Sequence, residues 1–301
     1  MQKKHSTVQT LLDAIPYIKK FYGKTIVIKY GGSAQTSPDL KEKFAQDIAL
    51  LCLVGIKPVI VHGGGARISE LLGKLEIHSE FVDGHRVTCG ESMRVVEMVL
   101  SGEINKNITS LLNHHGAKAI GISGKDSSII EAQPKDDGKF GYTGVVTKVN
   151  AKMINNLIKE GFVPVIAPIA DSAQPNHPGF NINADEAASK IAGAIGAQKV
   201  LFLTDIIGVL DKEKNLINSL DKDMVEAYKK DGTISGGMIP KVDSCLEAIY
   251  GGVNKAHIID GRVEHSILLE LFTSDGIGTQ FVRKDNPNNG IDMEKLLNDE
   301  M

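Results

Sequence analysis

Lysine and glycine residues follow two apolar runs in the first quarter of the chain. The run 25–30 carries Lys29 and is followed by Gly31 and Gly32, and a second run is followed by the glycines at 63–65. A lysine supplies positive charge, and glycines let backbone N–H groups approach an anion because they lack a Cβ atom. Two such turns side by side would hold two anionic groups, as phosphoryl transfer requires. The simpler alternative for Lys29 is a strand-end lysine that reaches solvent.

Other charged residues stand where they could bind anions. Arg86 could clamp a substrate carboxylate with its forked guanidinium, or be a solvated loop arginine. Asp185, at a predicted helix start, is already favoured there by the helix dipole, whereas Lys241 in a first helical turn opposes the dipole and points to a nearby anionic ligand. For Asp126 and Asp205, turn chemistry and ligand contacts both remain open.

Familiar glycine motifs do not account for these turns. A dinucleotide-binding pattern beginning at Gly63 fails because Ile68 stands where a third glycine is needed, and a P-loop ending at Gly23 fails because Ile18 replaces its first glycine. The run His62–Gly65 is similar to a lipase oxyanion-hole motif. That chemistry also needs a Gly-x-Ser-x-Gly turn, which the chain lacks, so we set the hydrolase interpretation aside.

The segments between these residues alternate between strand and helix patterns, which predicts a three-layer αβα sandwich with a mostly parallel central sheet. A hairpin with strands at 129–132 and 140–149 is expected as a flap near the site. Residues 171–179 are expected to be a loop, and 211–231 a polar, largely solvated segment. Strands are expected at 25–30, 57–62, 117–122, 162–169, 199–204 and 256–259. Helices are expected at 37–54, from 68, at 92–100, 104–115, 150–160, 183–194, 235–250 and 264–272.

Four regions are expected along the chain. Residues 1–22 form an amphipathic helical segment that Pro16 should interrupt or kink, and that either packs on its own domain or joins copies of the chain. A substrate lobe is expected at 23–180, a nucleotide-binding lobe at 181–285, and a frayed tail at 286–301.

Bulk composition excludes several classes of protein. The chain has 301 residues, of which 42% are hydrophobic, and a net charge of −3, so no nucleic-acid partner is expected. No apolar run approaches the roughly 18 residues of a membrane span. Cys52, Cys89 and Cys245 lack metal-ligand spacing and are interpreted as reduced thiols. We therefore expect a cytoplasmic α/β protein without a protein-bound metal.

The order of the motifs resembles that of the amino-acid kinase family, and most of all its members that phosphorylate N-acetyl-L-glutamate. The resemblance runs from about residue 17 to 282. It depends on the segments 27–32, 61–65, 83–88, 123–126, 180–185 and 236–241. Ala66, Arg67 and Ile207 depart from residues common in the family.

The resemblance implies transfer of the γ-phosphoryl group of ATP to the side-chain carboxylate of N-acetyl-L-glutamate, with Mg²⁺ bound mainly by the phosphates. It implies that Lys29 and Lys241 stabilise the transferred group and that Asp185 orients both lysines. The implied substrate-binding residues are Gly64, Gly65, Arg86 and Asn181. The implied nucleotide-binding residues are Gly31, Gly32, Thr204, Asp205, Gly208, Ser235, Gly237 and Met238.

Residues 256–279 resemble the arginine-inhibited branch of the family. This implies a homo-hexamer, a trimer of dimers joined by the N-terminal helix, with L-arginine bound at Tyr17, His257 and Glu270. Two alternatives stay open: a related kinase acting on UMP, carbamate, glutamate or aspartate, and a non-catalytic arginine-sensing subunit. The resemblance also leaves open whether a nitrogen-signalling protein binds.

Overall fold

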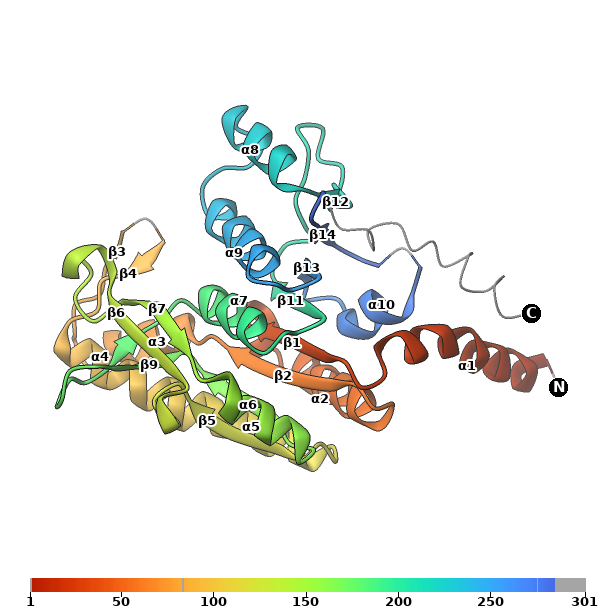
Figure 1. Ribbon diagram of the computed structural model, residues 1–301, viewed down its shortest axis with the longest axis horizontal. Coiled ribbons are helices and arrows are strands. Elements are labelled where there is room, and N and C mark those ends of the chain that lie inside the picture. The colour runs from red at the N-terminus through yellow and green to blue at the C-terminus, as the bar shows by residue number, and fades with distance from the viewer. Residues whose placement is uncertain (1, 83, 275, 285–301) are drawn as a thin grey trace.

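The computed structural model of the chain describes residues 2–82, 84–274 and 276–284. Its centre is an eight-stranded sheet in the order β12-β14-β13-β11-β1-β2-β8-β5, with helices on both faces (Figure 1). Of its neighbouring strand pairs only β13 and β14 run antiparallel. The predicted αβα sandwich with a mostly parallel sheet is therefore confirmed. The strands are β1 (Thr25–Tyr30), β2 (Lys57–His62), β5 (Ala119–Ser123), β8 (Val163–Ala167), β11 (Lys199–Thr204), β12 (Ser219–Leu220), β13 (Lys255–Asp260) and β14 (Thr279–Phe281).

Successive side chains of the central strands belong to two different buried clusters, one on each face of the sheet. In β1, Val27 belongs to one buried cluster and its neighbours Ile26 and Ile28 to the other, because successive side chains point to opposite faces of a sheet. Helices α6, α7, α8 and α9 supply the first cluster, and α2, α5 and α10 supply the second. The helices are α1 (Gln2–Phe21), α2 (Pro38–Leu53), α3 (Gly65–Lys74), α4 (Gly90–Glu97), α5 (Asn105–His114), α6 (Ala151–Lys159), α7 (Ala184–Ala194), α8 (Lys222–Lys230), α9 (Met238–Tyr250) and α10 (Ser266–Phe272).

A second, four-stranded sheet contains the predicted hairpin. Its order is β10-β9-β6-β7, and β6 and β7 pair antiparallel, as expected. The single strand predicted at 162–169 is wrong: β8 ends at Ala167 and β9 starts at Ile169 in the other sheet. Pro168 lies between them and has no N–H to continue the ladder. The loop predicted from residue 171 consequently begins inside β9. These strands are β6 (Ile130–Pro134), β7 (Gly144–Val149), β9 (Ile169–Ser172) and β10 (Phe180–Asn181), and a small hairpin pairs β3 (Phe81–Val82) with β4 (His85–Arg86).

The structure bears on three predictions for helical segments. Pro16 does not interrupt α1, which continues to Phe21, and the kink expected at this proline stays a prediction. The two helices expected at 92–100 and 104–115 are joined by a π-helix, η2 (Met98–Ile104). The segment 211–231 is polar and largely exposed, as predicted, and it also contains β12 and α8. The signal for α8 is Asp221, whose side chain caps the helix by accepting from the Met224 N–H.

Within residues 2–82, 84–274 and 276–284 no helix is both long and apolar enough to cross a membrane. The tail predicted at 286–301 lies outside the described residues. Strands from both predicted lobes share one sheet, and the lobe boundaries stay predictions.

Candidate active site

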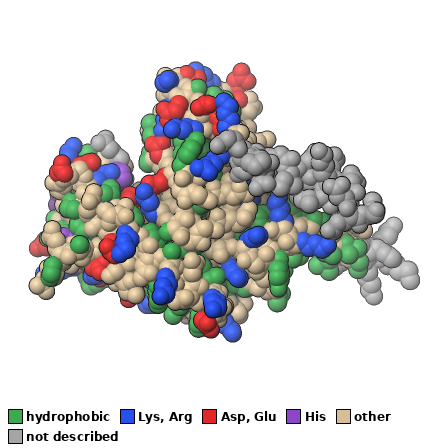
Figure 2. All heavy atoms as spheres, in the orientation of Figure 1, with side chains coloured by type: hydrophobic (Ala, Val, Ile, Leu, Met, Phe, Trp, Pro, Cys, Tyr) green, Lys and Arg blue, Asp and Glu red, His purple; other side chains and the backbone are tan. Residues whose placement is uncertain are grey.

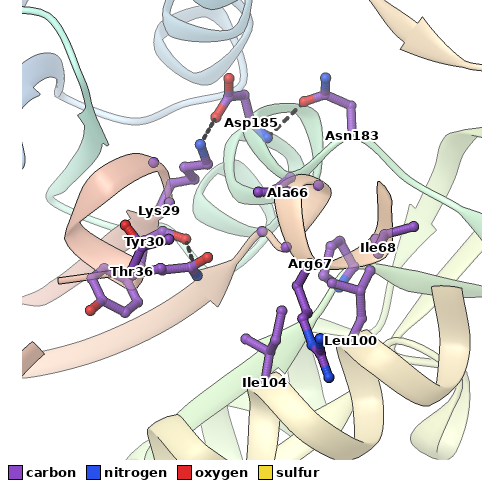
Figure 3. Close-up of a pocket in the computed structure, with 18 of the residues that line it drawn as sticks. Lys29, Tyr30, Thr36, Ala66, Arg67, Ile68, Leu100, Ile104, Asn183 and Asp185 are labelled. Atoms are coloured by element: carbon purple, nitrogen blue, oxygen red, sulfur yellow. Dashed lines mark hydrogen bonds and ion pairs between the residues drawn. The ribbon is translucent and has the colours of Figure 1, made fainter. Parts of the chain in front are cut away.

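The carboxyl ends of β1 and β2 open onto a cavity of about 780 Å³. Parallel sheets bind ligands at this edge because the loops that follow the strands meet there. The cavity is lined by both glycine turns and by Arg86 and Asn181. Lys29 and Asp185 also line it (Figure 3). Residues from distant parts of the chain, singled out by their type and spacing or, for Asn181, by the family resemblance, therefore meet at one place.

Asp185 lies between two lysines. Its carboxylate is 2.9 Å from the Lys29 ammonium and 3.3 Å from the Lys241 ammonium. Asn183 caps α7 by accepting from the backbone N–H of Asp185, which fixes the start of the helix (Figure 3). Burial raises the pKa of Asp185, but Lys29 and Lys241 outweigh it and hold that pKa below its usual value. The carboxylate therefore stays ionised and keeps two cations at the same edge of the sheet.

The first glycine turn leaves room for the Lys29 side chain. A Cβ atom on Gly31 would lie 2.7 Å from the Lys29 Nζ atom. Gly32 has a φ of +67°, and the N–H of Ser33 donates to Asp205 across 2.7 Å. Asp205 thus fixes the turn and also lines the cavity. Asp126 instead accepts from the backbone N–H of Ser123, which makes it a turn residue.

The second glycine turn is packed against the π-helix. A Cβ atom on Gly64 would lie 2.4 Å from Ile104 Cδ1 and 2.6 Å from Leu100 Cδ2. Figure 3 shows Leu100 and Ile104 extending from their helix toward this turn. Arg67, in the first turn of α3, forms ion pairs with Glu70 and Glu103, so two acidic side chains compensate its charge.

Arg86 is buried, and its guanidinium has hydrogen-bond partners within the protein. Its guanidinium donates to Ser69 across 2.8 Å, to the Gly65 carbonyl across 3.2 Å, and to Ser79, and it lies 4.6 Å from the centre of the Phe81 ring. Burial lowers the pKa of Arg86 below its usual value. These contacts tie the start of α3 to the β3–β4 hairpin at the wall of the cavity.

Asn181 is oriented by two buried threonines that the sequence did not indicate. Its amide donates to the Thr88 hydroxyl across 3.2 Å, and that hydroxyl is 2.8 Å from the Thr143 hydroxyl. Thr143 also donates to the Arg86 carbonyl. The network joins β4 and β10 through Thr88, which follows β4, and Thr143, which precedes β7.

Several residues predicted for the nucleotide do not line this cavity. Gly31, Gly32 and Asp205 do, whereas five others are absent from its lining. Gly208 has a φ of +146°, and a Cβ atom there would lie 2.6 Å from the Thr279 hydroxyl, so its backbone alone requires glycine. The segment before α9 leads directly into the helix that carries Lys241. The five residues outside the lining are Thr204, Gly208, Ser235, Gly237 and Met238.

Two of the three residues expected to bind an effector, His257 and Glu270, form a separate cluster. The Glu270 carboxylate is 2.6 Å from His257 Nδ1 and 3.6 Å from Lys199 Nζ. Lys199 lies over the ring of Phe21, one turn beyond Tyr17 on α1. Burial lowers the pKa of His257 to about 4 and that of Lys199 to about 8. Burial alone would raise the pKa of Glu270, but His257 and Lys199 bring it to about 2. Glu270 is therefore an anion with partners of its own.

No group of three or more His, Cys, Asp or Glu side chains with a metal-binding arrangement occurs among the described residues. Lys29 lines the cavity, whereas Lys241 is absent from its lining and is held beside it through Asp185.

Comparison with known proteins agrees with this architecture. The model of the amino acid kinase family matches residues 24–260. Acetylglutamate kinase from Aliarcobacter butzleri is 79% identical over 99% of both chains, and that from Wolinella succinogenes is 65% identical over 94% of this chain and 100% of its own.

Two solved structures share the fold. N-acetylglutamate synthase from Neisseria gonorrhoeae, complexed with coenzyme A and N-acetyl-glutamate, superposes with a TM-score of 0.82 at 25% identity; the match covers 93% of this chain and 64% of that one. Carbamate kinase from Giardia lamblia, bound to AMP-PNP, gives 0.65 at 18% identity over 87% and 99% of the two chains, a likeness of fold alone. From the family match and the full-length relatives we conclude that the chain belongs to the amino acid kinase family.

Proposed function

We propose that this protein transfers the γ-phosphoryl group of ATP to the side-chain carboxylate of N-acetyl-L-glutamate. The observation that carries the proposal is the pair of lysines held by Asp185 beside a cavity lined by Arg86 and Asn181. The near full-length relatives named acetylglutamate kinase support the choice of acceptor.

The reaction depends on neutralising the negative charge of the two reactants more than on covalent or general-base catalysis. A carboxylate oxygen attacks the γ-phosphorus, the bond from that phosphorus to the β-phosphate oxygen breaks, and the products are an acyl phosphate and ADP. Because the carboxylate is ionised at neutral pH, no general base is needed. Both reactants are anions, so Lys29 and Lys241 offset their repulsion and the charge of the transferring group. Mg²⁺ enters as part of the MgATP substrate, bound mainly by phosphates.

The two reactants would occupy the two sides of the Lys29–Asp185 pair. Backbone N–H groups of the second glycine turn, with Arg86 and Asn181, would hold the acylated amino acid. The N–H groups of the first turn would meet the phosphates, and the predicted nucleotide residues beyond the cavity would hold the rest of ATP. The cytoplasmic location expected from composition stays a prediction.

The acceptor is tested by comparing N-acetyl-L-glutamate, glutamate, aspartate, UMP and carbamate in one assay of ADP release. We expect turnover to be highest with N-acetyl-L-glutamate. Turnover with a different acceptor and none with N-acetyl-L-glutamate would refute the proposed substrate, and absence of turnover with all five would favour a non-catalytic role.

We also propose that L-arginine inhibits the enzyme by binding near Tyr17, His257 and Glu270. The synthase from N. gonorrhoeae, which shares the fold, has been solved with L-arginine. Glu270 is the anion that a guanidinium would pair with. Glu270→Gln should raise the arginine concentration needed for inhibition, whereas Glu264→Gln, a change of an exposed carboxylate, should not. Equal inhibition curves for all three proteins would refute this site.

A further inference from the structure

His62, the last residue of β2, is a fully buried histidine directly before the second glycine turn. Its Nδ1 atom is 3.1 Å from the carbonyl oxygen of Gly63, and its Nε2 atom is 3.2 Å from the amide nitrogen of Asn105. Neither residue has a role in the phosphoryl transfer described above. Both sit directly behind the wall of the cavity.

The partners of His62 decide where its proton is. A carbonyl oxygen can only accept, so Nδ1 must carry the hydrogen. The Asn105 amide nitrogen also faces the carbonyls of Val165 and Ile122, at 2.8 and 3.1 Å, so this nitrogen is a donor. The Asn105 carbonyl oxygen in turn accepts from Lys106. The two hydrogens of this amide are shared among three acceptors, and its nitrogen cannot accept a hydrogen bond. Nε2 of His62 therefore carries no hydrogen, and the imidazole is neutral. Burial, which lowers the pKa of His62 to about 4, acts in the same direction.

This hydrogen bond fixes a peptide plane. In a trans peptide the C=O of one residue and the N–H of the next point in opposite directions. Because the Gly63 carbonyl is held toward the buried imidazole, the Gly64 N–H is turned toward the opposite side, where Gly63 and Gly64 line the cavity. Glycine would otherwise let this plane rotate, since it restricts the backbone least.

We propose that His62 is a positioning residue whose Nδ1–H holds the Gly63 carbonyl, so that the Gly64 N–H stays aimed at the carboxylate that accepts the phosphoryl group, and that Asn105 maintains the required tautomer. The proposal deepens the proposed function and rests on it. It concerns how the acceptor anion is bound, and it leaves the nucleotide side unaffected.

Two substitutions of His62 distinguish the roles of its two ring nitrogens. The side-chain nitrogen of Asn is two bonds from Cβ, as Nδ1 is in histidine, whereas the nitrogen of Gln lies one bond further out, near the place of Nε2. His62→Asn can keep the donor to Gly63 and should change KM for the acceptor by less than about 3-fold. His62→Gln loses that donor and should raise KM for the acceptor by about 10-fold or more, with KM for ATP unchanged. Both variants lose the imidazole, so thermal unfolding should shift similarly in the two.

Equal acceptor KM values in the two variants, a larger defect in His62→Asn, or equal changes in KM for ATP and acceptor would overturn the proposal. A second measurement uses the unaltered protein and needs no variant to be stable. With ¹⁵N-labelled histidine, the His62 resonances, assigned by their loss in either variant, should show a protonated Nδ1, a bare Nε2 and no titration between pH 5.5 and 8. A protonated Nε2, or titration in that range, would refute it. If the unaltered enzyme uses another acceptor, the function proposal fails, and the same comparison on that acceptor still tests His62.

Discussion

At the scale of single residues, the site depends on glycines, which leave space where another residue would place a Cβ atom. Lys29 could be singled out from the sequence because a cation beside paired glycines has few structural explanations. The close approach of the Lys29 ammonium to Gly31 could not be predicted from the sequence. It depends on the ion pair with Asp185, which lies far away along the chain. Types and spacing therefore predicted candidate anion-binding groups, the family resemblance implied their roles, and tertiary contacts set their positions.

Gly31→Ala should act mainly on the chemical step. The added methyl group would lie 2.7 Å from Lys29 Nζ, so the lysine must move away from its place beside Asp185. Displacing one preorganised charge should lower kcat by about 10²-fold and change KM much less. Steady-state kinetics on both substrates measures this. The matched control is Gly73→Ala on α3, where a Cβ atom meets nothing within 4 Å. A normal kcat in Gly31→Ala would show that catalysis does not depend on the position of the Lys29 ammonium.

At the scale of elements, the regular strands were predictable because apolar, β-branched runs mark strands buried on both faces. The errors have local causes. Pro168 ends one strand and starts another in a different sheet, and α8 shows little apolar signal because Val225 is its buried residue. The π-helix η2 has no sequence signature that we recognise. It is nevertheless the element against which the second glycine turn is packed.

Gly64→Ala should disturb the acceptor side through that packing. The new methyl group would overlap Ile104 Cδ1 and Leu100 Cδ2, so either the turn or the π-helix must shift. We expect KM for N-acetyl-L-glutamate to rise several-fold and KM for ATP to stay nearly constant. Adding Ile104→Val removes one of the two overlapping atoms and should recover part of the loss. A Gly64→Ala enzyme with unchanged kinetics, or a double variant with strictly additive defects, would contradict this coupling.

At the scale of the whole molecule, two buried apolar clusters lie on opposite faces of the sheet, a third packs around α3, α4 and η2, and two neutral histidines are buried. Figure 2 shows acidic and basic side chains mixed over one face, including the region of α8, which agrees with the small net charge. A surface with mixed charges of both signs is expected to contribute little to the pH dependence of stability. The pH dependence of stability should therefore come from buried groups.

The free energy of unfolding should fall as the pH falls from about 6.5 to about 4. Burial lowers the pKa values of His62 and His257 to about 4, so in this range the unfolded chain takes up protons that the folded chain does not. Each histidine contributes a slope of at most about 1.4 kcal/mol per pH unit. Urea unfolding at pH 7.5 and pH 5 measures the loss, and His257→Gln should remove about half of the histidine contribution. The pKa of Asp47, which burial raises to about 6, acts in the opposite direction between pH 6 and pH 5 and offsets part of this loss. A loss as large in His257→Gln as in the unaltered protein would show that His257 is not buried in the neutral form.

The last prediction concerns α1, which extends away from the rest of the molecule (Figure 1). Its side chains Val8, Leu11, Leu12 and Ile15 are exposed although they are apolar, a pattern that marks a protein–protein interface. Phe21, in contrast, is buried and contacts Lys199, so residues up to 22 cannot be removed without opening the core.

Removal of residues 1–15 should therefore separate assembly from activity. We expect the full chain to sediment as a large homo-oligomer, as a trimer of dimers would, and the shortened chain as a smaller species with nearly unchanged kcat, because the cavity contains no residue of α1. Leu11→Glu together with Ile15→Glu should weaken assembly in the same way without shortening the chain, and Asp13→Lys, a change between them in sequence, should do so less. Analytical ultracentrifugation with parallel kinetics decides the question. If the shortened chain and the full chain form the same oligomer, α1 packs elsewhere and its exposed apolar side chains do not hold copies of this protein together.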